Sequence, residues 1–301
     1  MPVSYDNKLN NEVIKKNFKV FINGFQNSLN LTDNEMAEKL QLSDLSFQEY
    51  LLGKMELPLL SVYEILDEYN ICFEAILHNS VDYRALAQQA DGNLNYLPER
   101  YQQSANSNRR SAIYMLDYIN SKYGYHQRLS LMRKMQLNEN HFVNPDALNN
   151  IFLPLDICKS LFENGSKEDI IGMGMHFYDY SKESIVAGLI KEARSAPEAY
   201  EIMFSGVLEK YVERNFCWRI KSISSETCVL SGKLNSELEE IGSQIINQHM
   251  CLLRLGFASS ITRFINQPNA RVKKISCLAK SDKSCDYHVS FATKNSYNQF
   301  Q

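Results

Sequence analysis

The chain has 301 residues, of which 44% are hydrophobic and 11% aromatic, which suffices for more than one packed core and excludes an intrinsically disordered chain. Glycine and proline are sparse, at 12 and 7, so few residues are available for turns and an all-β architecture is disfavoured. The net charge of −3 is unevenly distributed, because residues 1–80 contain 6 Lys, no Arg and 12 Asp or Glu. This acidity opposes nucleic-acid binding in the N-terminal region.

No apolar run reaches the roughly 18 residues that a membrane-spanning helix requires, so we expect no membrane association. The N-terminus shows no charged leader followed by an apolar segment, so no secretion signal is predicted. The seven cysteines are an odd number and lie far apart, which favours free thiols in a reducing compartment. We therefore predict a cytoplasmic protein.

Residues 1–79 are predicted to form a small all-α domain. Apolar residues at helical spacing predict a helix over 10–30, and Thr32 with Glu35 forms a capping-box pattern that starts a second helix. Gly53 is placed to end a third helix in a left-handed conformation. That third helix is expected at 44–52, a fourth from Pro58, and a fifth at about 72–78.

The middle of the chain is predicted to connect two domains. Residues 80–108 are polar and rich in Gln and Asn, which predicts a linker with some local helix. Residues 109–149 are predicted to be a helical connector, with amphipathic helices at 109–123 and 126–136. The first of these helices is our candidate for part of a dimer interface.

Residues 150–293 are predicted to form an α+β domain, followed by a tail at 294–301. Alternating side chains predict strands at 216–223, 227–230, 271–278 and 287–291, paired as two hairpins. Helices are expected at 155–164, in pieces over 168–215, over 235–254, and from Gly256 to about 265. This order indicates an antiparallel sheet covered by helices, and an α+β class for the whole chain.

One N-terminal segment carries a helix-turn-helix pattern: Leu31–Ser43, followed by Phe47, Tyr50, Leu51, Gly53, Lys54, Pro58 and Ile65. The segment resembles the phage-repressor-like (Xre-type) DNA-binding domain over about residues 10–78, and the small Ala37 fits a close approach of two helices. The resemblance implies that the third helix enters the major groove and that the protein binds DNA as a homodimer. The residues that would contact DNA are Ser43, Asp44, Ser46, Phe47, Gln48, Tyr50 and Lys54.

The same segment departs from what DNA binding needs. Its third helix has no Arg or Lys and contains Asp44 and Glu49, although phosphate neutralisation supplies much of the affinity for DNA. The alternative hypothesis is that the module docks on a protein. If DNA is bound, the missing positive charge would come from Lys15, Lys16, Lys19, Lys54 or Arg109-Arg110.

Three cysteines near the end of the chain have a regular spacing: Cys251, Cys277 after 26 residues, and Cys285 after 8 more. With Leu255-Gly256 and the alternating segment 285–291, they resemble the 4-vinyl reductase family of small-molecule-binding domains, over about residues 150–292. The resemblance implies a structural zinc ion held by the three cysteines and a glutamate. Here the glutamate position is Lys274, which is protonated at neutral pH and a poor zinc ligand.

Three states of these cysteines stay open. A zinc ion would take Asp282, His249 or His288 as its fourth ligand. The thiols would otherwise be reduced and partly buried, or Cys277 and Cys285 would form a redox-active pair.

The resemblance also implies a ligand pocket between the sheet and its helices, for a small apolar or aromatic molecule. Aromatic residues on the predicted faces are the candidates to line it, with ordinary core packing as the alternative role. They are Phe177, Tyr178, Tyr180, Phe204, Trp218 and Phe257. A further hypothesis makes His176 a heme ligand, against a role as a hydrogen-bonded core residue.

No glycine-rich phosphate loop and no nucleophile-elbow motif is visible, so we do not predict an enzyme. The leading prediction is a transcription regulator in which ligand binding to the C-terminal domain changes how the N-terminal domain meets DNA. The alternative is a ligand-sensing adaptor whose acidic N-terminal module binds a protein partner.

Overall fold

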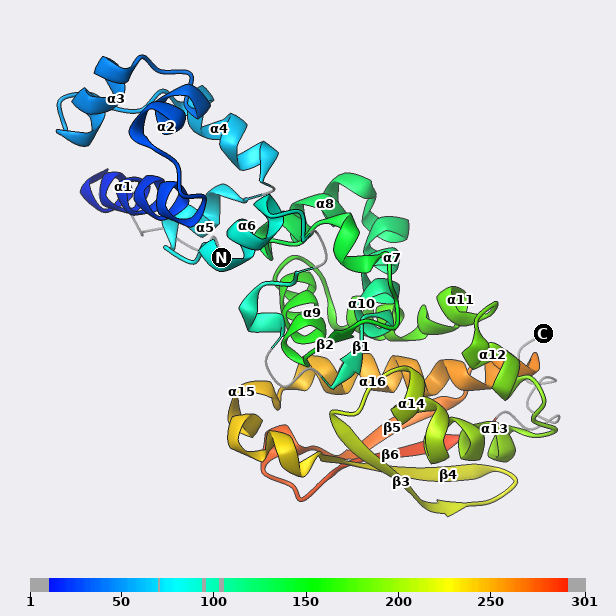
Figure 1. Ribbon diagram of the computed structural model, residues 1–301. Helices are drawn as coiled ribbons and strands as arrows, with labels where there is room; N and C mark the ends of the chain where they lie inside the picture. Colours follow the sequence, from blue (N-terminus) through cyan, green and yellow to red (C-terminus); the bar gives the residue numbers. More distant parts are fainter. Residues whose placement is uncertain (1–10, 70, 94–95, 103–105, 292–301) are drawn as a thin grey trace. The chain divides into compact units, whose positions relative to one another are not determined.

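The structure, a computed structural model, describes residues 11–69, 71–93, 96–102 and 106–291 (Figure 1). The chain forms two compact units. The first contains the residues up to Glu99 together with Leu129–Val143, and the second contains Arg100–Arg128 together with the residues from Asn144 on. Across these described ranges, no helix combines the length and the apolar character needed to cross a membrane. The predicted tail, 294–301, lies outside the described residues.

The first unit is built from short helices around one apolar core. Its N-terminal helices are α1 (Asn11–Ser28), α2 (Asp33–Lys39), α3 (Asp44–Leu51), α4 (Leu59–Glu68), α5 (Phe73–Leu77) and α6 (Tyr83–Ala90). Helix α8 (Tyr125–Lys134) enters it from Leu129 on, and a 3₁₀ turn follows at Glu139–Phe142. The largest core side chains are Phe21, Phe25, Met36, Leu40, Phe47 and Ile65.

Local signals set the helix ends in this unit. The predicted capping box is confirmed, because Thr32 accepts the N–H of Glu35 and the Glu35 carboxylate accepts the N–H of Thr32. Each cap satisfies backbone donors that the first helical turn leaves free. Gly53 has the predicted left-handed conformation, with φ of 72°, and Pro58 precedes α4 as predicted.

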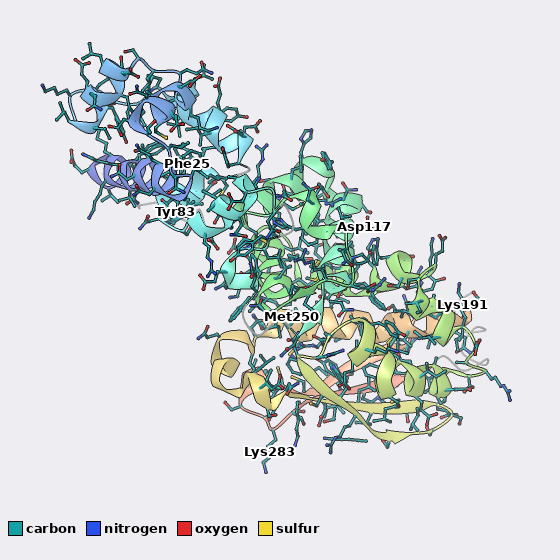
Figure 2. The ribbon with its side chains drawn as sticks, in the orientation of Figure 1. Phe25, Tyr83, Asp117, Lys191, Met250 and Lys283 are labelled. Carbon is teal, nitrogen blue, oxygen red and sulfur yellow. The ribbon has the colours of Figure 1, made fainter. Side chains whose placement is uncertain are left out.

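The segment predicted as a linker contributes an ordered helix. Asp82 caps α6 by accepting the N–H of Ala85, at 3.0 Å, and Leu86 belongs to the core of the first unit. The ring of Tyr83 packs over Gly24 on α1, where a Cβ atom would lie 2.4 Å from the ring (Figure 2 labels Tyr83). The first unit therefore extends beyond the predicted boundary at residue 79.

The second unit combines a four-stranded sheet with helices. Its helices are α7 (Arg110–Tyr123), α9 (Phe152–Asn164), α10 (Lys167–Met175), α11 (Phe177–Ser181), α12 (Ile185–Ile190), α13 (Ala196–Ile202), α14 (Leu208–Tyr211), α15 (Gly242–Ile245) and α16 (Gln248–Ser260). A π-helical segment, Met203–Val207, joins α13 to α14. Two short strands, β1 (Ser107–Asn108) and β2 (Leu148–Asn149), pair antiparallel.

The main sheet confirms the predicted hairpins and the α+β class. Its strands are β3 (Phe216–Ile223), β4 (Thr227–Leu234), β5 (Arg271–Ser276) and β6 (Cys285–Ser290), in the order β3-β4-β6-β5, and all neighbours are antiparallel. Strand β6 alternates strictly, with Cys285, Tyr287 and Val289 buried. The helices cover one face of the sheet (Figure 1).

The predicted helix over 235–254 is wrong, because the chain breaks at Asn247. A 3₁₀ turn, Ser236–Ile241, leads into the short α15, and the side chain of Asn247 then accepts the N–H of Met250 to begin α16. An Asn side chain that satisfies a free backbone donor favours a new helix start over continuation.

Gly256 lies inside α16 and does not open a separate helix as predicted. A Cβ atom at Gly256 would lie 1.9 Å from the carbonyl oxygen of Ile171 on α10. A Cβ atom at Gly174 would lie 2.0 Å from the carbonyl oxygen of Leu253 on α16. These two glycines let the backbones of α10 and α16 touch, so the contact has no space for a side chain.

Helix α7 uses its apolar side within the second unit. Tyr114, Met115, Leu116 and Ile119 are all buried, and α7 packs against α9, α10 and α11. The ring of Tyr114 meets that of Phe177 at 5.4 Å between centroids. This packing leaves little apolar surface for the predicted role of α7 in a dimer interface.

Candidate functional site

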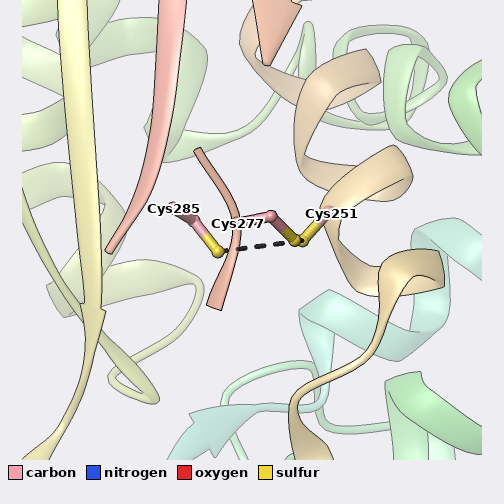
Figure 3. Close-up of side chains that lie close together, drawn as sticks. All are labelled: Cys251, Cys277 and Cys285. Carbon is pink, nitrogen blue, oxygen red and sulfur yellow. Dashed lines mark hydrogen bonds between the residues drawn. The ribbon is translucent and has the colours of Figure 1, made fainter. Parts of the chain in front are cut away.

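The three cysteines converge at one point between helix and sheet (Figure 3). Cys251 comes from α16, Cys277 follows β5, and Cys285 begins β6. The sulfur of Cys251 lies 3.3 Å from that of Cys277 and 3.7 Å from that of Cys285, and all three residues are buried. Two sulfurs on one tetrahedral zinc ion, at about 2.3 Å from the metal, are about 3.8 Å apart. The cluster is therefore of the right size to hold a metal ion.

The cluster is also poised to lose a proton. The hydrogen bond from Cys251 is the main cause that lowers the pKa of Cys285 to about 7, and the backbone N–H of Leu278 and the charge of Arg254 act in the same direction. The pKa of Cys251 is raised, first by its interaction with Cys285 and then by burial. Cys285 is therefore the cysteine of the group that loses its proton most readily, and thiolates are the form that binds metal.

None of the predicted fourth ligands joins the cluster. Among the described residues, only the three cysteines come close enough to one another to share a metal ion. The carboxylate of Asp282 instead accepts the N–H of Cys277 at 2.7 Å. The ring of His249 packs on Phe162, with 4.3 Å between centroids, and His288 contacts Ser290. Three cysteines thus supply three of the four ligands that zinc prefers.

The turn before Cys285 contains a left-handed residue that is not glycine. Ser281 adopts this conformation with φ of 67°. Glycine is the residue that takes it at least cost. The carboxylate of Asp282, which accepts the N–H of Cys277, closes the same turn and helps to hold it.

A cavity of ≈ 40 Å³ is bordered by residues of α16 on either side of Cys251 in the sequence. Its lining is mostly aliphatic and aromatic. The residues are Ser111, Tyr114, Pro154, Leu208, Val212, Glu213, Trp218, Met250, Leu253, Arg254 and Phe257. Met250 lies near the start of α16 (Figure 2), and Trp218 lies on β3.

The predicted pocket residues divide into two groups. Trp218 and Phe257 line the cavity, and the ring of Phe204 packs on Trp218 at 5.5 Å between centroids. Phe177 is fully buried behind Phe257 and acts as core. Tyr178 packs between Phe264 and the guanidinium of Arg263, and neither Tyr178 nor Tyr180 lines this cavity. Trp218 and Phe257 therefore stay candidates for ligand contact, whereas Phe177, Tyr178 and Tyr180 lie elsewhere.

Arg254 is the cavity residue that sequence reasoning missed. It is only 6% exposed, its guanidinium carbon lies 3.6 Å from the centroid of the Phe216 ring, and its Nε lies 3.5 Å from a carboxylate oxygen of Glu213. Burial acts to lower its pKa, but the charges of Glu213 and neighbouring groups outweigh burial and raise it. The signal in the sequence was a lone arginine within the apolar run from Met250 to Ala258 of α16.

The predicted DNA-contacting residues lie on or beside α3. Ser43 caps the helix, and Asp44, Gln48 and Lys54 are exposed. Gln48 donates to the carboxylate of Asp33 at 3.0 Å. Ser46 is half-buried beside Ser43.

Two aromatic residues of that set face inward. Phe47 is fully buried in the core of the first unit, so the prediction that it contacts DNA is wrong. Tyr50 is half-buried, and burial raises its pKa to about 12. Phe47 and Tyr50 are three residues apart, so both lie on the apolar side of α3, which faces the core and not DNA.

Several exposed leucines, which the sequence did not predict, lie on α3, directly after it, and at the start of α4. Leu45, Leu52, Leu59 and Leu60 are each about 70% exposed, and Tyr63 on α4 is also exposed. Asp44, Glu49 and Glu64 lie among them in the sequence and are exposed as well. Lys15, one of the basic residues expected to compensate, is paired with Glu56 at 2.6 Å. We name the residues Leu45, Leu52, Leu59, Leu60 and Tyr63 the leucine surface.

His176 has the geometry of a hydrogen-bonded structural residue. Its Nε2 lies 2.8 Å from a carboxylate oxygen of Asp117, and its ring packs on Tyr118. The carboxylate of Asp179, near its other ring nitrogen, is held by two hydrogen bonds from Arg263. The side chain is therefore engaged within the second unit, which does not support the heme hypothesis.

No known protein family and no curated protein matches this chain. Among solved structures, an H-NOX protein from K. algicida in its Fe(II) unliganded form matches with 12% identity and a TM-score of 0.48, over 64% of this chain and 100% of that chain. A mutant of the same H-NOX protein, also in the Fe(II) unliganded form, matches with the same values. Similarity at this level does not establish a shared fold or a shared ligand.

Proposed function

We propose that this protein is a small-molecule sensor. The observation that carries the proposal is the cavity in the second unit, which is lined by aliphatic and aromatic side chains and contains buried polar groups. A concave apolar site with a few convergent polar groups is the usual form of a ligand site. The proposal is of a regulator, and not of an enzyme.

Helix α16 supports a route from ligand to conformational change. It contributes Met250, Leu253, Arg254 and Phe257 to the cavity. It also touches α10 through Gly174 and Gly256, without space for a side chain. A ligand that shifts α16 must therefore shift α10 with it, since close-packed helices transmit displacement.

We propose zinc as a structural ion at Cys251, Cys277 and Cys285. The spacing of the three sulfurs and the lowered pKa of Cys285 support it. The ion would supply a structural link, because the three cysteines that hold it come from α16, from the end of β5 and from β6. The proposed location is the reducing cytoplasm, where such thiols stay free.

The proposed output is DNA binding by a homodimer through α3 of the first unit. The capped α2–turn–α3 arrangement supports it, together with the exposure of Asp44, Gln48 and Lys54. Two such helices, about one turn of DNA apart, would read a palindromic site. Ligand binding in the second unit would change the affinity for that site through its unequal affinity for two arrangements of the dimer.

A protein partner is the second candidate for the output. The exposed side chains of the leucine surface and the exposed carboxylates near them in the sequence favour it, because exposed apolar and acidic groups suit a protein interface better than a phosphate backbone. In this case the protein would be a ligand-responsive adaptor.

Binding to the DNA upstream of its own coding sequence separates the two outputs. We would measure it against random competitor DNA at about 50 and 200 mM salt. Specific binding that weakens with salt and falls in Gln48→Ala, but not in the matched exposed variant Glu38→Ala, would support the regulator. If the protein does not bind this DNA at low salt, with or without a small-molecule extract, the DNA-binding output is wrong and the adaptor becomes the favoured function.

A further inference from the structure

We infer that the cavity binds a small carboxylic acid in its ionised form, and that Arg254 holds the carboxylate. This inference rests on the proposed ligand site and names the chemical class of its ligand. It depends on hydrogen-bond donors that the protein itself leaves unused.

Two donors of Arg254 are unpaired in the folded chain. Nε and Nη2 are both buried from solvent and make no hydrogen bond, although the residue as a whole is only 6% exposed. A buried donor without a partner costs on the order of 1–3 kcal/mol, and more when it is charged. These two nitrogens lie on the same edge of the guanidinium, which presents two parallel N–H bonds and matches the two oxygens of a carboxylate.

Two other arginines in the second unit do form this two-bond pairing, with a carboxylate of the protein itself. Arg263 donates through two nitrogens to the two oxygens of Asp179, at 3.0 and 2.8 Å. Arg100 does the same with Asp156, at 2.7 and 3.1 Å. Both of these arginines are more exposed than Arg254. The most buried arginine of the three is thus the one whose Nε and Nη2 make no hydrogen bond.

Glu213 neutralises Arg254 without filling that fork. Its carboxylate oxygen lies 3.5 Å from Nε, which is an ion pair but not a hydrogen bond, and its side chain is 13% exposed. The plane of the guanidinium is also fixed, because Arg254 stacks on Phe216. A ligand carboxylate would compete with Glu213 for the charge of Arg254, so removing the charge of Glu213 should tighten binding.

The remaining lining defines the rest of the ligand. Leu208, Val212, Met250, Leu253 and Phe257 are apolar, so the body of the ligand should be a short branched chain or a ring. The space of ≈ 40 Å³ favours a small body and requires side chains to move for an aromatic ring. Isobutyrate and benzoate are therefore suitable probes of two sizes.

Trp218 allows a direct test, because it lines the cavity and is the single tryptophan of the chain. We would titrate the full-length protein with isobutyrate and benzoate, and with their uncharged amides, at constant ionic strength, following tryptophan fluorescence. We expect saturable binding of at least one acid, roughly 10-fold or more tighter than its amide. Arg254→Met should weaken acid binding roughly 10- to 100-fold, and Glu213→Gln should strengthen it.

Two further variants separate a loss of acid recognition from a loss of folding. Arg254→Met leaves Glu213 buried without its partner, so the double variant Arg254→Met/Glu213→Gln keeps the site neutral and should show the same loss of acid preference. Arg263→Met is the matched control, because it removes an arginine away from the cavity and should leave acid binding unchanged.

Three results would overturn the inference. Amides that bind as tightly as the acids, or acids that bind the double variant as tightly as the wild type, would remove Arg254 from ligand recognition while leaving the ligand cavity in place. If neither acids nor amides change the fluorescence at millimolar concentration, the proposed ligand cavity itself fails.

Discussion

The two units use their charged residues in opposite ways. In the first unit the buried polar residues among those described are Ser61 and His141, and Lys pairs with carboxylates at the surface, as in Lys15 with Glu56, whose side chains are 58% and 78% exposed. In the second unit Arg254 and Glu213 lie inside, at 7% and 13% side-chain exposure, beside three buried thiols. Exposed pairs contribute little to stability, whereas buried groups without full pairing reduce it. Departures from full pairing are expected at functional or strained sites, so the difference directs attention to the second unit.

Phe47→Ala should give the largest change in the free energy of unfolding, and it tests whether Phe47 belongs to the core of the first unit. Removing a fully buried phenylalanine should lower the free energy of unfolding by about 3–5 kcal/mol. Leu45→Ala, two residues earlier on the same helix and 71% exposed, should change it by less than about 0.5 kcal/mol. Urea unfolding followed by circular dichroism would measure both. Equal losses in the two variants would contradict the assignment of Phe47 to the core.

Gly256→Ala tests the close contact of α10 and α16 in the second unit. The new Cβ atom would meet the backbone of Ile171, so we expect a loss of about 3 kcal/mol or more in the free energy of unfolding. Gly188→Ala on α12 is the control, because nothing lies within 4 Å of its Cβ position and alanine favours a helix. A Gly256→Ala protein as stable as the wild type would show that the two helices can separate, and would remove the proposed coupling.

Zinc should stabilise the second unit through its cysteines. At about 100 times the dissociation constant, a metal bound only to the folded state adds about 2.7 kcal/mol and raises the unfolding temperature. Cys285→Ser should abolish this gain, whereas Cys228→Ser, a buried cysteine outside the cluster, should retain it. Differential scanning calorimetry with and without one equivalent of zinc would decide. A gain that survives in Cys285→Ser would place the metal elsewhere.

The smallest predicted effect is a loss in the free energy of unfolding at low pH. The hydrogen bond from Lys122 is the main cause that lowers the pKa of Asp169 to about 2, assisted by the backbone N–H of Ser166. Because the folded pKa lies below the ordinary value near 3.8, this contribution is present above about pH 4 and is lost as the pH falls toward 2. Asp169→Asn should make the acid limb of the stability profile shallower. An unchanged profile would show that the carboxylate contributes nothing.

The sequence predicted the local parts of both units well and the long-range parts poorly. Thr32, Glu35, Gly53 and Pro58 act within a few residues of themselves, so their pattern was sufficient to place helix ends. The family resemblance, which the cysteine spacing carries, likewise implied one site for the three cysteines. Gly256 was misread as a helix start because its reason, the backbone of α10, lies far away along the chain.

The candidate site could be predicted only in part, for the same reason. Trp218 and Phe257 were expected to line a pocket and do line the cavity, since aromatic residues on helix and strand faces turn toward a core. Arg254 was not expected, because its importance comes from what surrounds it: Phe216 on one side, Glu213 at one edge, and no hydrogen bond from two of its nitrogens. Periodicity carries no information about unpaired donors.

Hydrogen–deuterium exchange of the full-length protein, with and without a saturating concentration of the acid that binds more tightly, isobutyrate or benzoate, tests the central claim most directly. If the chain is a sensor, that acid should slow exchange in α16 and α10 and change it in α3 or α4 of the first unit. Exchange in α16 and α10 that is the same with and without the acid, or slowed there with no change in the first unit, would contradict a ligand-responsive regulator.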